Sequence, residues 1–225
     1  MATVFFKKSI KNVAVIVSFF IISVSLIFAY LLKNATCVAH SQTFYFLVSV
    51  STHVEAGAYE VAQKGGAGYL LCTDERAYVA FSVYFTETES KSAQKNLRQD
   101  ECKIVTKTAG NLYFKSYKEK QNASRIVDAF SCLRSCMDLL NKESVRLANG
   151  ATQESSGRIL KSLQKQFSYL VKKYETCFSD FSTMCKNAAN ALNTVMESTI
   201  YVKDLRKTLC SLCDEYVRLA GKFSL

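Results

Sequence analysis

The chain has 225 residues, of which nine are cysteine and none is proline or tryptophan. An average chain of this length would contain roughly 11 prolines. Proline-rich linkers and recognition segments are therefore excluded, and long uninterrupted helices are favoured. A hydrophobic content of 49% and a charged content of 21% exclude global disorder. The net charge of +10 divides into +4 over residues 1–33, −1 over 42–110 and +7 over 111–225, which predicts three organisational units.

The first of these units predicts a membrane anchor. The segment from Val13 to Leu32 contains no charged residue, and its twenty residues would form a helix of about 30 Å, the thickness of a bilayer core. Three lysines precede the segment, which predicts a cytoplasmic N-terminus and a single-pass protein with most of the chain outside the cytoplasm. A cleaved signal peptide is the alternative, but its hydrophobic region is usually shorter.

The cysteines admit two interpretations. Nine cysteines in an exported chain suggest disulfides, although their number is odd. Two pairs, Cys132/Cys136 and Cys210/Cys213, have helical spacing, so they are equally well interpreted as small core residues on one helix face. Zinc binding has little support, because the only histidines are His40 and His53. We expect no metal and no cofactor.

The middle unit predicts a β-α-β-β-α-β order. Strands are expected at 43–51, 69–73, 77–85 and 102–108, where β-branched and aromatic residues gather. Helices are expected after the capping boxes Thr52-x-x-Glu55 and Thr86-x-x-Glu89. This order is that of the ferredoxin-like fold, in which two helices cover one face of a four-stranded antiparallel sheet. The fold class is therefore α+β.

Strand alternation predicts which side chains lie on the other face of this sheet. The more apolar sets should face the two helices: Phe44, Phe46, Val48 and Val50, with Val79, Phe81 and Val83. The opposite sets are Tyr45, Leu47, Ser49 and Ser51, with Tyr78, Ala80, Ser82 and Tyr84. Their hydroxyl groups and rings could form a shallow platform for a sugar or a peptide, or this face could pack against the C-terminal helices.

The region from Phe44 to Thr108 resembles a SPOR (sporulation-related repeat) domain. The resemblance is carried by the phrases FLVSVST at 46–52, GGAGY at 65–69 and AYVAFSVY at 77–84, and by the TETE that follows at 86–89. It implies a non-catalytic module that binds peptidoglycan glycan strands at sites of division or sporulation. On the matching sheet face, the implied glycan-binding residues are Tyr45, Ser49, Ser51, Tyr78 and Ser82.

The third unit predicts a helical hairpin or bundle. From residue 125 onward apolar residues recur at steps of three and four, with a turn at Asn149-Gly150 and a further break near 179–183 or 194–199. We therefore expect two or three helices. The surplus of seven positive charges is either a solvated surface or suited to a polyanionic surface.

No catalytic constellation is visible, so we expect a protein that is not an enzyme. Two functions follow: a membrane-anchored protein that binds peptidoglycan at the cell envelope, or an extracytoplasmic scaffold whose sheet face is covered by its own C-terminal helices. Envelope proteins or self-association through the helical region are the expected protein partners. Nucleic acid is not expected for an exported chain.

Overall fold

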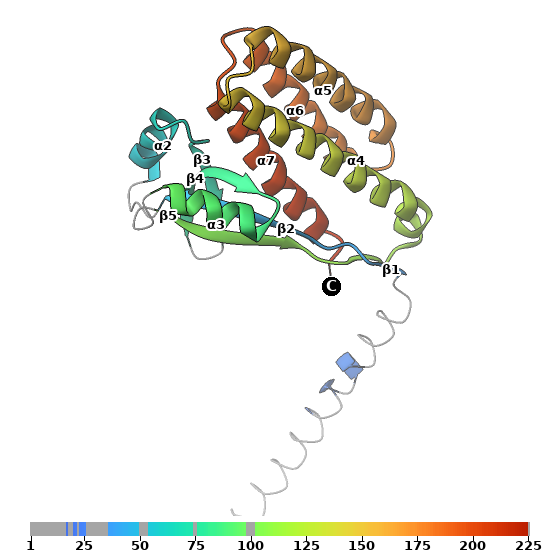
Figure 1. The fold of residues 1–225 in the computed structure, drawn as a ribbon. Coiled ribbons are helices and arrows are strands. Elements are labelled where there is room, and N and C mark those ends of the chain that lie inside the picture. Colours follow the sequence, from blue (N-terminus) through green and yellow to red (C-terminus); the bar gives the residue numbers. More distant parts are fainter. Residues whose placement is uncertain are drawn as a thin grey trace, which may run out of the picture.

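The computed structural model describes residues 36–49, 54–73, 76–97 and 102–224, together with Val17, Phe20, Ile21, Ser23, Val24 and Ser25. The fold is α+β. A four-stranded antiparallel sheet lies beneath a layer of long helices, and a short two-stranded ribbon lies at one end of the sheet (Figure 1). The α+β class expected from the sequence is confirmed for these residues.

The four-stranded sheet and its two short helices follow the predicted order. The elements are β2 (Gln42–Ser49), α2 (Val54–Gln63), β3 (Tyr69–Cys72), β4 (Ala77–Tyr84), α3 (Glu87–Asn96) and β5 (Cys102–Ala109). The spatial order is β3-β4-β2-β5, with every neighbouring pair antiparallel. The β-α-β-β-α-β prediction is therefore confirmed, and so is the pairing of β3 with β4 as a hairpin.

The predicted start of α3 is also observed. Thr86 has extended backbone angles, and its Oγ1 accepts a hydrogen bond from the backbone N–H of Glu89 at 3.2 Å. This bond satisfies one of the N–H groups that a helix leaves unpaired at its first turn. The predicted Thr52–Glu55 capping box lies outside the described side chains.

The C-terminal unit contains four helices, rather than the two or three expected. They are α4 (Tyr117–Ala148), α5 (Gln153–Tyr174), α6 (Ser179–Met196) and α7 (Val202–Gly221). The predicted Asn149-Gly150 turn separates α4 from α5, and Gly150 has the positive φ of 91° that glycine adopts without a steric penalty. The other two turns, at 175–178 and 197–201, lie near the two places where a further break was expected, 179–183 or 194–199, and both breaks are present rather than one.

Two short strands were not expected. Thr36–Val38 forms β1, which pairs antiparallel with β6 (Leu112–Phe114). The backbone N–H of Tyr113 in β6 also donates to the carbonyl oxygen of Phe223 at 2.7 Å. These bonds hold the segment before β2, the segment after β5 and the end of the chain together.

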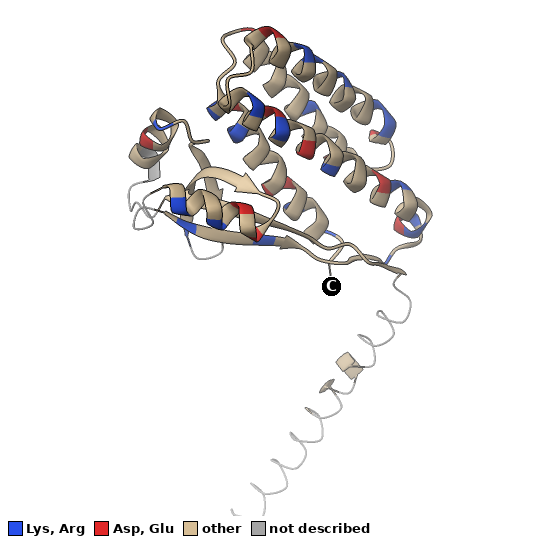
Figure 2. Ribbon diagram, viewed as in Figure 1, with Lys and Arg blue, Asp and Glu red and all other residues tan. Residues whose placement is uncertain are grey.

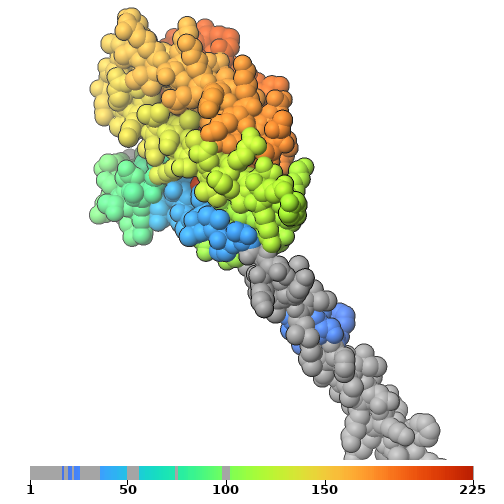
Figure 3. All heavy atoms as spheres, turned by 90° about the vertical axis from the view of Figure 1, so that its right-hand side faces the viewer, coloured from blue at the N-terminus to red at the C-terminus, as the bar shows by residue number. Residues whose placement is uncertain are grey.

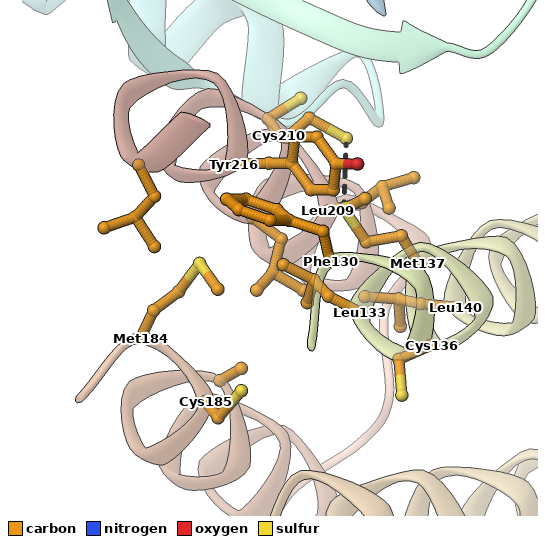
Figure 4. Close-up of a cluster of buried hydrophobic side chains, with 14 of the residues drawn as sticks. Phe130, Leu133, Cys136, Met137, Leu140, Met184, Cys185, Leu209, Cys210 and Tyr216 are labelled. Atoms are coloured by element: carbon orange, nitrogen blue, oxygen red, sulfur yellow. Dashed lines mark hydrogen bonds between the residues drawn. The ribbon is translucent and has the colours of Figure 1, made fainter. Parts of the chain in front are cut away.

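A single buried cluster spans the sheet and the helices, although the sequence separates these units near residue 110. It contains residues of β2 and β4 together with residues of all four long helices. Figure 4 shows its centre, where Phe130 of α4, Met184 of α6 and Tyr216 of α7 converge. Figure 3 shows the same stacking from the side, with the yellow and orange helices packed above the blue strands.

The predicted transmembrane helix and single-pass localisation are not supported. No helix in the part of the chain that the structure describes is both long enough and apolar enough to cross a membrane. The long helices α4 to α7 are amphipathic, because each has a buried apolar side and a charged exposed side. Most of the predicted segment at 13–32 lies outside the described residues. For the residues that the structure describes, the fold class is therefore corrected to α+β with no helix that could span a membrane.

Candidate functional site

Helix α7 covers the sheet face that the two short helices leave open. It contacts β3, β4 and β5, and its Tyr216 packs edge-on against Phe44 of β2 with ring centroids 5.3 Å apart. Both rings are fully buried. Of the two alternatives for this face, an open platform or a surface packed against the C-terminal helices, the structure contains the second.

The opposite face packs against α2 and α3. Leu47, Val79, Phe81 and Cys102 form a separate buried cluster there, with Ala58 of α2 and Ala93 of α3 packed against it. The sheet is therefore buried on both faces, which accounts for the apolar residues on both sides of β2 and β4.

A β-bulge changes the predicted assignment of side chains to faces. Leu47 pairs with Ser82, but the next residue, Val48, pairs with Ala80, so Phe81 is an extra residue on β4. Phe44, Phe46 and Val48 consequently face the long helices, whereas Val79 and Phe81 face α2 and α3. Val83 lies on the same face as Phe46, so the bulge divides the expected set of Val79, Phe81 and Val83 between the two faces. The expectation that Phe44, Phe46 and Val48 face the two short helices was wrong, because both faces of the sheet have an apolar cover.

The bulge also divides the five candidate glycan-binding residues. Tyr45, Ser49 and Ser82 are at positions that face α2 and α3, as their partners in the register show. Tyr78 belongs to the cluster on the other face, and Ser51 lies outside the described residues. The structure therefore does not bring the five residues together on one surface.

Tyr78 lies between two cations. Its hydroxyl oxygen accepts hydrogen bonds from Arg76 Nε at 2.5 Å and from Lys103 Nζ at 2.7 Å, and both cations also lie over its ring. The hydrogen bond from Lys103 is the main cause that lowers the pKa of Tyr78 below 10.0, and it acts against the raising effect of burial. This cluster lies at the start of β4 and was not predicted.

A second polar cluster joins the sheet to α7. Lys107 Nζ donates to Asp214 Oδ1 at 2.6 Å and to the carbonyl oxygen of Cys72 at 2.7 Å. The hydroxyl of Tyr69 donates to Asp214 Oδ2 at 3.0 Å. An adjacent hollow of about 530 Å³ lies between β5 and α7 and is lined partly by Lys107, Asp214 and Arg218.

Two further hollows follow along the helical layer. One of about 220 Å³ lies between α6 and α7 and shares Glu215 and Arg218 with the hollow beside β5. One of about 470 Å³ lies between α5 and α6 and shares Thr183 with its neighbour. The described residues that line these three hollows include no aromatic side chain, whereas pockets for small organic ligands are usually lined by apolar and aromatic groups.

All nine cysteines are free thiols. Cys136, Cys185, Cys210 and Cys213 are buried between the helices, and burial raises their pKa values, to about 11 for Cys136. A thiol with a raised pKa is a poor nucleophile and a poor metal ligand. The interpretation of the helical pairs as small core residues fits Cys136, Cys210 and Cys213, while Cys132 is only partly buried.

His40 contacts a buried residue of α7. His40 Nε2 lies 2.7 Å from the hydroxyl oxygen of buried Tyr216, and burial lowers the pKa of His40. The described residues contain no group of three or more histidine, cysteine or acidic side chains that could hold a metal ion.

No protein-family model matches the chain, and no curated protein or solved structure is significantly similar to it. The SPOR resemblance therefore stands on the quoted residues alone.

Proposed function

We propose that this protein is a non-catalytic interaction scaffold, in which the sheet is an internal support and the outer faces of the helices contact a partner. The observation that carries this proposal is the position of α7, which fills the sheet face that a ferredoxin-like order leaves open. Fully buried Phe44 and Tyr216 meet across this contact. A ligand would have to displace α7 to reach that face.

The surface that remains for a partner is largely helical. Charged residues gather on the outer sides of α4 and α5, as Figure 2 shows. Leu139 of α4 and Tyr169 of α5 are 41% and 62% exposed, so these outer faces also include large side chains that can contribute contact area.

Binding of peptidoglycan strands stays a prediction. Tyr78 lies on one face of the sheet, and Tyr45, Ser49 and Ser82 are at positions on the other, so one glycan strand bound to one face would contact only part of the set. Both faces are also covered by helices of the same chain.

Sedimentation with insoluble peptidoglycan, before and after removal of the stem peptides, tests the two functions against each other. We expect the full chain to stay in the supernatant with both preparations. Sedimentation with the stripped strands, reduced in a Tyr45→Ala or Tyr78→Ala variant that remains folded, would favour glycan binding and contradict the proposal.

Photo-crosslinking tests the scaffold directly. A photoreactive residue placed at Leu139 or Tyr169 of the full chain, in the native cell, should form adducts with another protein. The matched control is the same residue at exposed Lys95 of α3. Adducts that form only at Lys95, or at none of these positions, would contradict a partner-binding role for the helical layer.

A further inference from the structure

One side of α5 carries a stripe of positive charge. Arg158, Lys161, Lys165 and Lys172 are separated by three, four and seven residues, which places them on the same helix face, and Tyr169 lies among them. The opposite face of α5 is buried in the core through Leu160, Leu163, Phe167 and Leu170. The direction of the stripe is therefore fixed by the packing of the helix.

Most of the charge on this stripe is not neutralised within the chain. Arg158 pairs with Glu154 one turn earlier. Among the residues that the structure describes, no acidic side chain lies within ion-pair distance of Lys161, Lys165 or Lys172. By contrast, Lys173, one position further along, turns toward α4 and pairs with Asp128 at 2.7 Å. The chain thus leaves its three stripe lysines available to an external anion.

A groove runs beside the stripe. It lies between α5 and α6, has a volume of about 470 Å³, and is lined by Lys172 of α5, Lys186 of α6 and the amide side chains of Gln164 and Asn190. Ammonium and amide N–H groups both donate hydrogen bonds to carboxylate oxygens. The groove therefore adds donors and a recess to the charge of the stripe.

Two acidic residues limit the length of this surface. Glu154 precedes the stripe, and Glu175, which also lines the groove, follows it. The span from Arg158 to Lys172 is about 21 Å at 1.5 Å per residue. An extended peptide of about six residues has this length, whereas a long polyanion would continue past Lys172 and be repelled by the carboxylate of Glu175.

We propose that the α5 stripe and the adjoining α5–α6 groove form a docking surface for a short acidic segment of a partner protein. The chemistry of the cations favours protein carboxylates over nucleic acid. Lysine predominates here, whereas arginine, with its bidentate geometry, is favoured for phosphate and base recognition. Exposed Tyr169 supplies an aromatic contact in the middle of the stripe. This inference rests on the proposed function and specifies the chemistry of the partner.

The probe for the test is a fluorescein-labelled twelve-residue peptide in which glutamate alternates with serine. Its affinity for the full chain is measured by fluorescence anisotropy. The stripe variant is Lys161→Gln/Lys165→Gln/Lys172→Gln. The control is Lys95→Gln/Lys118→Gln/Lys207→Gln, which removes the same charge from exposed lysines on other helices. All six positions are exposed, so both variants should keep the native thermal midpoint.

We expect the stripe variant to lose affinity by about tenfold and the control by less than about twofold, because close charges act more strongly than net charge at moderate salt. Equal losses in both variants would overturn the proposal, as would tighter binding of a single-stranded DNA twelve-mer than of the acidic peptide. No binding of the acidic peptide by the wild-type chain would also overturn it. The sedimentation and crosslinking results above remain separate readouts of the scaffold itself.

Discussion

Lys107 of β5 and Asp214 of α7 form an ion pair of 2.6 Å across the interface between the sheet and the last helix. Their side chains are 20% and 22% exposed, so water screens this pair only partly. The same carboxylate accepts the hydroxyl of Tyr69 from β3. One acidic residue of α7 thus fixes the helix to two strands that lie at opposite edges of the sheet.

Replacing Asp214 with Asn should therefore destabilise the protein by about 1–3 kcal/mol, because the Lys107 charge loses its partner while remaining half-buried. Urea unfolding followed by circular dichroism measures the loss. The matched control is Glu154→Gln, which breaks a pair whose side chains are both 77% exposed and should change stability by less than about 0.5 kcal/mol. Equal effects of the two substitutions would contradict this account.

Tyr78 should ionise at a lower pH than the other tyrosines whose pKa is shifted. Hydrogen bonds from Lys103 and Arg76 lower its pKa, whereas burial raises the pKa of Tyr69 and Tyr216. Ultraviolet titration of phenolate formation in the folded protein measures these steps. Tyr78→Phe should remove a step at lower pH than the steps that Tyr69→Phe and Tyr216→Phe remove. A step removed by Tyr78→Phe at the same pH as that of Tyr69→Phe, or at a higher pH, would rule out the two-cation geometry.

The stability of the protein should fall as the pH decreases below about 6.5. Burial lowers the pKa of His40 from 6.5, so the folded state favours neutral imidazole while the unfolded chain binds a proton. The contribution is thus fully present above pH 6.5 and decreases below it. Denaturant midpoints between pH 8 and pH 5 should decline in the wild type and decline less in His40→Gln. Parallel profiles would show that His40 is not the group responsible.

Gly66 should not tolerate a side chain. A Cβ atom there would lie 2.6 Å from Val61 Cγ1 and 2.9 Å from Phe81 Cδ1, both in the tightly packed cluster under α2. Gly66→Ala should cost about 1–3 kcal/mol. Gly110→Ala is the control, since its Cβ would meet no atom within 4 Å and its φ is not positive, and it should be neutral or slightly stabilising. A neutral Gly66→Ala would contradict the packing described here.

Thiol labelling should divide the cysteines by depth. Cys37 and Cys72 are exposed and should react quickly with a disulfide reagent in the native protein. Cys185, Cys210 and Cys213 should react only after unfolding, because burial raises their pKa and excludes the reagent. Mass spectrometry of labelled peptides distinguishes the sites. Native-state labelling of Cys210 or Cys213 at the rate of Cys72 would contradict the position of α7.

The sequence pattern predicted the strands and the helical seam well, because both depend on local periodicity. The seam residues Leu205, Leu209, Leu212, Tyr216 and Leu219 are all buried, as their spacing indicates. The seam did not show that α7 is apolar over a wider arc, which includes Cys210, Cys213 and Ala220. That wider arc is the signal for a helix that packs against a sheet and a bundle at once, and it was available in the sequence.

The candidate site could be predicted only in part, because the β-bulge between β2 and β4 decides which face of the sheet its residues occupy. Leu47 and Val48 are consecutive and both fully buried, which is possible because each face of the sheet has its own apolar cover. Alternation alone cannot locate a bulge between two buried residues. The ion pair of Lys107 with Asp214 joins residues 107 positions apart, and no local pattern indicates a contact of that range.

The order of the strands and α7 along the chain has a consequence for synthesis on the ribosome. The strands emerge well before α7, the helix that covers Phe44, Phe46 and Val48, and Tyr113 obtains its partner only once Phe223 has emerged. Until then one apolar face of the nascent sheet is without its cover, a state that favours aggregation or binding of chaperones. A premature stop codon before residue 202 would make that state permanent.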